Sequence, residues 1–89
     1  MILGKVVGTV WATRKDEDLV GMKFQIVKHV DLNYKVKETF VVAVDTVQAG
    51  VGDVVLVTSG SSARQTALTK NKPVDAVIIA VVDKLDVGE

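Results

Sequence analysis

The alternation of apolar and polar residues along the chain predicts β-strands separated by polar connections. Four segments are rich in β-branched residues or alternate between apolar and polar positions, and a fifth segment near the end is apolar on both faces. The connections contain glycine, aspartate or proline, which favour turns. The predicted strands span residues 1–12, 22–30, 39–47, 53–58 and 76–85.

The connections predict how neighbouring strands are joined. Residues 31–38 supply the turn of a hairpin between the second and third strands. Residues 48–53 contain two glycines and predict a tight turn between neighbouring antiparallel strands. The charged segment 13–21 ends in glycine and is expected to be a solvated loop.

Two glycines interrupt the first predicted strand. Gly4 and Gly8 are four residues apart and are expected on one face of an extended strand. There they would allow a sharp bend or the close approach of another backbone. The alternative is an ordinary strand that tolerates two glycines.

The segment between the fourth and fifth strands departs from the strand pattern. SSARQTALTK, residues 61–70, predicts two turns of helix, which Pro73 would end. Ser62 and Gln65 have the spacing of a capping box, and Gly60 would turn the chain from strand to helix. The alternative interpretation is an anion-binding helix start. Capping leaves Arg64 unexplained, and we interpret it as a candidate contact between subunits.

These elements predict one domain over residues 1–89. The fold class is mainly β: a small five-stranded OB-like antiparallel barrel with one short helix between the fourth and fifth strands. Such closure removes unpaired sheet edges, and the helix would plug one end.

Composition narrows the function. Eleven basic and eleven acidic residues give zero formal net charge, which argues against nonspecific binding to nucleic acid or acidic lipid. There is no cysteine, and the longest apolar run, 76–82, is too short to cross a bilayer, so we expect a soluble, cytoplasmic protein. His29 has no evident catalytic partner, and the carboxylates of 16–18 are expected to be solvated. We therefore expect no enzyme activity, metal or cofactor.

Apolar residues make up 48% of the chain, which is much for so small a domain. A short helix cannot cover every two-sided strand, so association with another chain is the better explanation. An OB-like barrel also allows the alternative of a module that binds single-stranded nucleic acid. Aromatic residues make up only 4% of the chain, which disfavours that alternative.

Taken together, several segments resemble the EutN/CcmL family of pentameric vertex proteins from bacterial microcompartment shells. They are LGKVVGTVWATRK, LVGMKFQIV, VVAVDTVQAGVGDVVLVTSGSSAR and PVDAVIIAVVD, which together cover nearly the whole chain. The resemblance implies a homopentamer that closes the vertices of a polyhedral shell and docks onto hexameric shell proteins, without nucleic acid or membrane as a partner. Hexagonal tiles alone make a flat sheet, so a closed polyhedron needs pentagonal units.

The resemblance also implies roles for individual residues. Ser59, Gly60, Ser61 and Ser62 would line a narrow opening on the five-fold axis. Contacts with neighbouring subunits or hexamers would involve Arg14, Lys15, Gln48, Ala49, Gly50 and Arg64. Many family members have GAG where this chain has Gln48 before Ala49 and Gly50, so the resemblance does not define the detailed shape of that contact.

Overall fold

Five strands and two short 3-10 helices make up the fold of the computed structural model, which describes residues 1–88. The order of four strands, a short helix and a fifth strand is confirmed. The elements are β1 (Ile2–Val10), η1 (Glu17–Leu19), β2 (Phe24–Val30), β3 (Val36–Asp45), β4 (Val54–Ser59), η2 (Gly60–Arg64) and β5 (Ala76–Val81).

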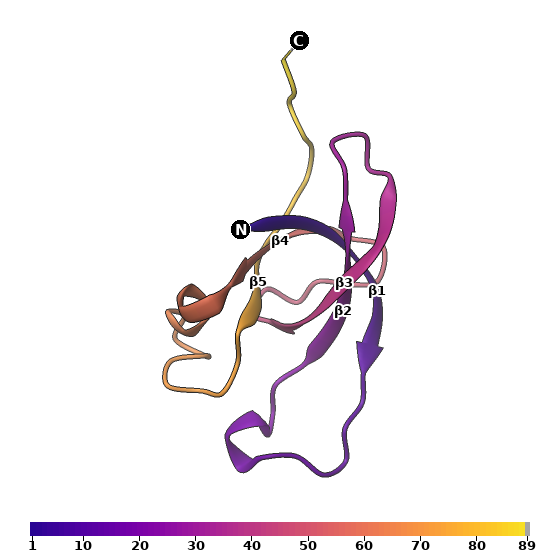
Figure 1. Ribbon diagram of the computed structural model, residues 1–89. Coiled ribbons are helices and arrows are strands. Elements are labelled where there is room, and N and C mark those ends of the chain that lie inside the picture. Colours follow the sequence, from indigo (N-terminus) through magenta and orange to yellow (C-terminus); the bar gives the residue numbers. More distant parts are fainter. Residues whose placement is uncertain (89) are drawn as a thin grey trace.

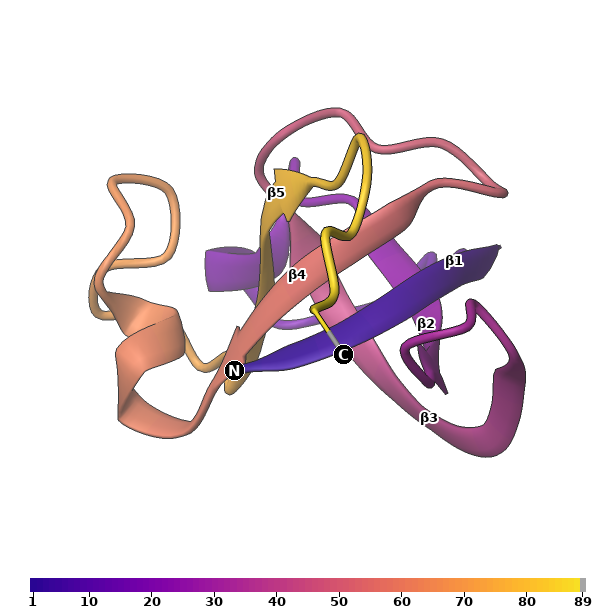
Figure 2. The same cartoon turned by 90° about the horizontal axis from the view of Figure 1, so that it is seen from above.

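The strands close into a barrel in the order β1-β2-β3-β5-β4 (Figures 1 and 2). The barrel prediction is confirmed, but the expectation of antiparallel pairing throughout is wrong for one pair. β3 and β5 are parallel, with Val44 opposite Val77. The turn 48–53 also does not join neighbouring strands, because β5 lies between β3 and β4. A parallel pair cannot be joined by a tight turn, so the chain reaches β5 only after passing through β4 and η2.

Two apolar clusters explain why β5 is apolar on both faces. Ile78 points into the barrel, and Val77 points outward beneath η2 and the β1–β2 connection. Buried members of the inner cluster are Val6, Val27, Ala43, Ala49, Val55, Val57, Ala76 and Ile78. Those of the outer cluster are Val44, Ala63, Val74 and Val77, packed against Leu19, Met22, Phe24 and Ile79. The chain itself therefore covers part of the outer face of β5.

A β-bulge separates the environments of the two glycines in β1. Gly4 pairs with His29 and Gly8 with Ile26, and the register shifts between Val6 and Gly8. The one-residue shift puts Gly4 on the inner face and Gly8 on the outer face, so the expectation of a shared face is wrong. A methyl group at Gly4 would overlap Val27 and lie 2.8 Å from the backbone oxygen of Lys28. The predicted close approach of another backbone is thus confirmed at Gly4.

The segment after β4 is shorter and tighter than predicted. It forms a single 3-10 helix, η2, followed by turns, in place of two α-helical turns. The capping box is also wrong, because the residue that precedes the helix is Ser59 and its side chain makes no capping hydrogen bond. Gln65 instead follows the helix and donates its backbone N–H to the Ser62 backbone oxygen at 3.2 Å. Ser62 lies inside the helix, where its hydroxyl cannot serve the first turn.

The β2–β3 hairpin and the C-terminal segment both extend away from the barrel, as Figure 1 shows. Residues 36–40 of β3 are exposed along their whole length. The C-terminal segment is anchored by a hydrogen bond of 2.7 Å from the Val82 backbone N–H to the Val54 oxygen. A second bond, of 3.0 Å, runs from the Leu85 backbone N–H to the Tyr34 hydroxyl at the hairpin tip.

Within the described residues, no helix has the length and apolar character that crossing a membrane would require.

Candidate functional site

The residues singled out from the sequence lie in three separate places on the barrel (Figure 1). Ser59, the last residue of β4, leads into η2, which holds Gly60–Arg64. Residues 48–50 lie in the connection from β3 to β4, and residues 14 and 15 lie in the β1–β2 connection. The structure therefore does not gather them into one site within a single chain.

The η2 segment presents small polar side chains on a fixed backbone. Residues 59–62 are all exposed. Gly60 has a positive φ of 66°, a conformation that suits glycine, and donates its N–H to the Asp75 oxygen at 2.8 Å. Arg64 donates from Nη1 to the Val74 oxygen at 3.2 Å while its residue stays exposed. η2 is thus tied at both ends to the residues that precede β5.

The connection between β3 and β4 is a rigid turn. Gly50 donates its N–H to the Asp53 carboxylate at 2.8 Å, and the Asp53 N–H returns a bond of 3.0 Å to the Gly50 oxygen. Gln48 is exposed with a φ of 59°, whereas Ala49 is 1% exposed. The surface of this turn therefore consists of Gln48 and the residues after Ala49.

A buried polar network, which the sequence did not reveal, holds this turn against the barrel. Gln25 is 1% exposed and donates from Nε2 to the Ala49 oxygen at 2.9 Å and to the Asp45 carboxylate at 3.2 Å. Its Oε1 accepts the Thr9 hydroxyl at 2.8 Å. The described residues contain no buried side-chain nitrogen or oxygen without a partner. The sequence signal for this network is a glutamine at an inward-facing position of a strand.

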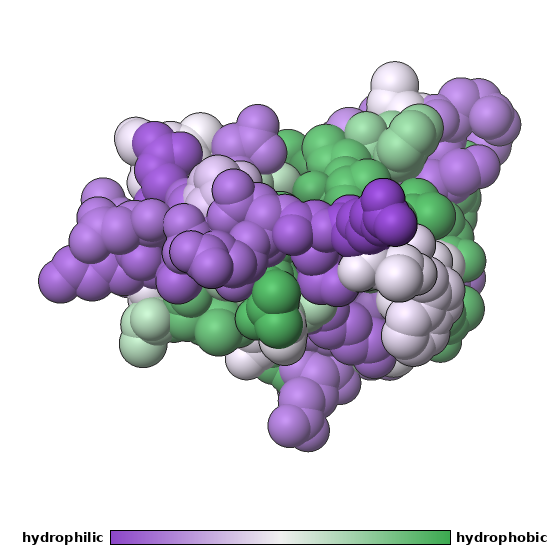
Figure 3. Space-filling view, turned by 90° about the horizontal axis from the view of Figure 1, so that it is seen from below, coloured by the Kyte–Doolittle hydropathy of each residue, from purple (hydrophilic) through white to green (hydrophobic). Residues whose placement is uncertain are grey.

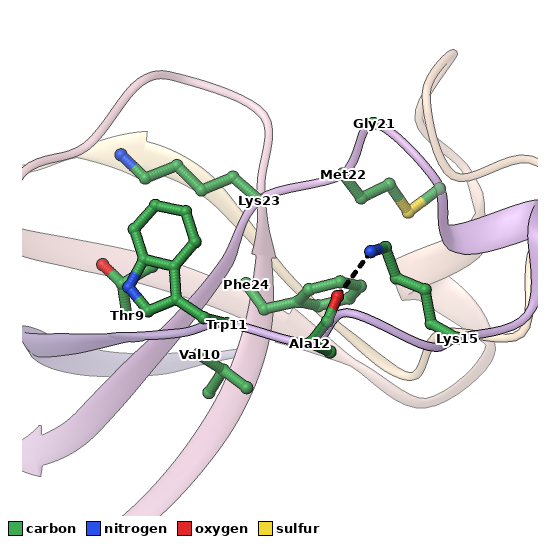
Figure 4. Close-up of a pocket in the computed structure, with 9 residues that line it drawn as sticks. All are labelled: Thr9, Val10, Trp11, Ala12, Lys15, Gly21, Met22, Lys23 and Phe24. Carbon is green, nitrogen blue, oxygen red and sulfur yellow. Dashed lines mark hydrogen bonds between the residues drawn. The ribbon is translucent and has the colours of Figure 1, made fainter.

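An open cleft lies beside the β1–β2 connection (Figure 4). It has a volume of about 470 Å³, and Trp11, which is 88% exposed, stands at its edge. The Lys15 ammonium donates to the Ala12 oxygen at 2.6 Å, so part of its hydrogen-bonding capacity is used within the chain. The cleft is lined by Thr9, Val10, Trp11, Ala12, Lys15, Gly21, Met22, Lys23 and Phe24.

His29 and the acidic run 16–18 have local structural partners. His29 Nδ1 lies 2.6 Å from the Thr39 hydroxyl in a cross-strand contact. In the acidic run, Asp16 accepts the Asp18 N–H at 2.9 Å, and Asp18 pairs with Lys72 at 3.6 Å. Residues 1–88 contain no cluster of histidine, aspartate and glutamate that would hold a metal ion.

Large apolar side chains remain in contact with solvent over much of the molecule. Seen from the end that carries the β1–β2 connection, apolar surface lies on both sides of a hydrophilic band (Figure 3). Exposed examples include Phe40 at 58% and Val51 at 68%. Contiguous apolar surface on a small protein is characteristic of contacts with other proteins.

A closed β-barrel with fixed polar turns and exposed apolar faces defines a protein whose candidate sites are contact surfaces. The chain belongs to the EutN/CcmL family, whose model, described as ethanolamine utilisation protein EutN/carboxysome, matches residues 1–83. The membership expected from the sequence motifs is therefore confirmed.

Relatives along the whole chain carry related descriptions. The bacterial microcompartment shell vertex protein GrpN of Rhodospirillum rubrum is 41% identical over 97% of this chain and 97% of its own. The carboxysome shell vertex protein CcmL of Synechococcus elongatus is 40% identical over 98% of this chain and 88% of its own.

Solved structures share the fold. The structure of Gloeobacter violaceus CcmL has a TM-score of 0.93 and 39% identity, covering 98% of this chain and 90% of that chain. The structure of the GrpN pentameric microcompartment shell protein from Rhodospirillum rubrum has a TM-score of 0.90 and 40% identity, covering 99% of this chain and 100% of that chain.

Proposed function

We propose that this protein is a vertex subunit of a bacterial microcompartment shell in the cytoplasm and that it assembles as a homopentamer. The observation that carries the proposal is the end-to-end likeness to GrpN, described as pentameric, with a TM-score of 0.90 and coverage of 99% and 100%. The exposed apolar side chains support it, because a monomer gains nothing from leaving them in water.

The η2 segment is proposed to lie at the five-fold axis. Ser59, Gly60, Ser61 and Ser62 would line the central opening, with their small exposed side chains leaving it narrow and polar. Arg64 would contact the adjacent subunit. Its Nη1 bond to the Val74 oxygen supports this, because it fixes the guanidinium while other N–H groups stay available.

The remaining contact residues are proposed to lie away from that axis. Arg14 and Lys15 would meet a neighbouring subunit or a hexameric shell protein, as would Gln48 and Gly50 in the turn after β3. Ala49 is buried, so it would support this contact indirectly. Its backbone oxygen accepts from Gln25 at 2.9 Å, which holds the turn in place. A flat layer of hexamers would curve and close where such pentamers are inserted.

Native mass spectrometry of the purified protein tests the assembly. The proposal expects a mass of five subunits and, on mixing with a hexameric shell protein, closed particles in electron micrographs. A species that stays monomeric at every concentration would contradict the pentamer, and open sheets with no closed particles would contradict the vertex role.

Charge reversal at Arg64 tests the proposed contact. Arg64→Glu should lower the fraction of pentamer on dilution, because it puts a carboxylate where a guanidinium faces the next subunit. Lys84→Glu, which makes the same change of charge at an exposed residue outside the proposed contacts, is the control. Equal dilution curves for the two variants would remove Arg64 from the interface.

The proposed role is structural and needs no enzyme activity, cofactor or metal, in line with the shell vertex descriptions of the relatives. A module that binds single-stranded nucleic acid is the alternative. Titration with labelled oligonucleotides separates the two, because such binding is electrostatic and weakens steeply with salt. A salt-dependent affinity would favour the alternative.

A further inference from the structure

The outward-facing residues of β3 are apolar where a solvated strand would be polar. Side chains alternate along a strand, and Ala43 belongs to the inner cluster, so Phe40, Val42 and Val44 point outward. Opposite Val42 on β2 lies Ile26, which shares this outer face. An antiparallel pair with one face in water normally carries polar residues there.

The chain covers only one end of this face. Val44 is 1% exposed, because Leu19 and Phe24 in the outer cluster pack against it. Further along β3, Val42 is 42% exposed and Phe40 is 58% exposed. The apolar surface therefore continues past the end of its intramolecular cover.

A shallow groove of about 130 Å³ joins the covered end to the exposed end. Its lining residues are Leu19, Phe24, Val42, Val44 and residues 73–76. Its lining is mostly apolar, so it is suited to an apolar side chain from another molecule. We call Ile26, Phe40, Val42 and this groove the β2–β3 face.

Charged residues border the β2–β3 face. Lys28 lies directly opposite Phe40, and Glu38 is exposed two residues before Phe40 on β3. An apolar centre within a polar rim is the usual anatomy of a protein–protein interface. Basic and acidic residues number eleven each, so net charge does not oppose the approach of an identical molecule.

We infer that a second copy of this chain covers the β2–β3 face. The inference rests on the proposed homopentamer and deepens it by assigning one of its contact surfaces. A closed ring is built from heterologous contacts, so the β2–β3 face of one copy must meet a different surface of the next. The exposed turn 48–53 is such a surface, because Figure 2 shows it and the β2–β3 hairpin as separate parts of the molecule, on either side of the end of β1.

A pair of identical substitutions tests the assignment. Val42→Lys introduces a charge into the β2–β3 face, whereas Val87→Lys introduces it at a position of similar exposure, 51%, in the C-terminal segment. Dissociation is measured by sedimentation velocity over a dilution series, with circular dichroism as a check of the fold. Val42→Lys should raise the midpoint concentration of dissociation about tenfold or more, as is typical of a buried interface residue. Val87→Lys should match the wild type.

The outcomes separate this inference from the proposed function. A pentameric wild type with both variants dissociating alike overturns the assignment of the β2–β3 face and leaves the pentamer intact. A wild type that never assembles overturns both. If Val42→Lys fails to fold, hydroxyl-radical labelling of the wild type decides: Phe40 should be modified several-fold more slowly in the pentamer than in the diluted monomer. Equal labelling of Phe40 in both states overturns the inference.

Discussion

Replacement of Gly4 by alanine would place a methyl group against the neighbouring strand β2. The new carbon would overlap a Val27 methyl group and lie 2.8 Å from the Lys28 backbone oxygen. Val27 is fully buried and the oxygen belongs to the sheet backbone, so neither moves away easily. The strands must therefore separate locally at this point.

The magnitude follows from two opposing effects. Overpacking in a well-packed core costs about 1–3 kcal/mol. Alanine also restricts the unfolded chain, which stabilises the protein by about 0.4–1 kcal/mol where the backbone permits it. The net loss for Gly4→Ala is then about 0–2.6 kcal/mol with a centre near 1 kcal/mol. A loss of about 1 kcal/mol lowers the melting temperature of a domain of this size by about 4–8 °C.

Gly8→Ala is the matched control, because a methyl group there would meet only the end of Ile26 at 3.5 Å, an ordinary contact. This variant should equal or slightly exceed the wild type in stability. Both variants are unfolded in urea at one fixed subunit concentration, since assembly makes stability depend on concentration. Circular dichroism is the better signal, because Trp11 is 88% exposed and senses little of the core. If Gly4→Ala were as stable as Gly8→Ala, the argument from close approach would be refuted.

Three further predictions concern polar contacts. Gln25→Met should destabilise the protein by about 1–3 kcal/mol in urea unfolding, because the buried Asp45 carboxylate and the Ala49 oxygen would lose their donor. Asp31 accepts the backbone N–H groups of Lys35 and Asn33, which lowers the pKa of its carboxyl group. The stability difference between wild type and Asp31→Ala should therefore be constant at neutral pH and vanish as the pH falls through that lowered pKa. Lys72→Ala should change stability by less than about 1 kcal/mol, because its 3.6 Å ion pair with Asp18 is solvent-accessible.

Each of these predictions has its own control. Gln65→Met removes an exposed glutamine and should be neutral; a loss equal to that of Gln25→Met would count against the buried network. For Asp31, a stability difference that persists at the lowest pH would show that the carboxylate is not the stabilising form. For Lys72, added salt should reduce the stability difference between wild type and Lys72→Ala, because salt screens an exposed ion pair. A stability difference that grows with salt would contradict the ion pair.

The contact residues show where the sequence was informative about the site. The sequence indicated that the glycine and serines of residues 59–62 form a conformationally special junction. In the structure Gly60 has a positive φ, and all four residues are exposed. Their placement at an axis depends on subunits outside one chain, which no local pattern describes. Gln25 escaped notice because its partners Asp45 and Ala49 are 20 and 24 residues away and meet it only after the barrel closes.

The sequence by itself determined the number, order and approximate bounds of the strands, and its motifs indicated the family. Those properties follow from the local alternation of side chains and from turn residues, which act within a few positions. Only the tertiary structure decided the parallel pairing of β3 with β5, the bulge that separates Gly4 from Gly8, and the division of β5 between two clusters. Each depends on which strands become neighbours when the barrel closes, and pairing between distant segments leaves no periodic trace in either segment alone.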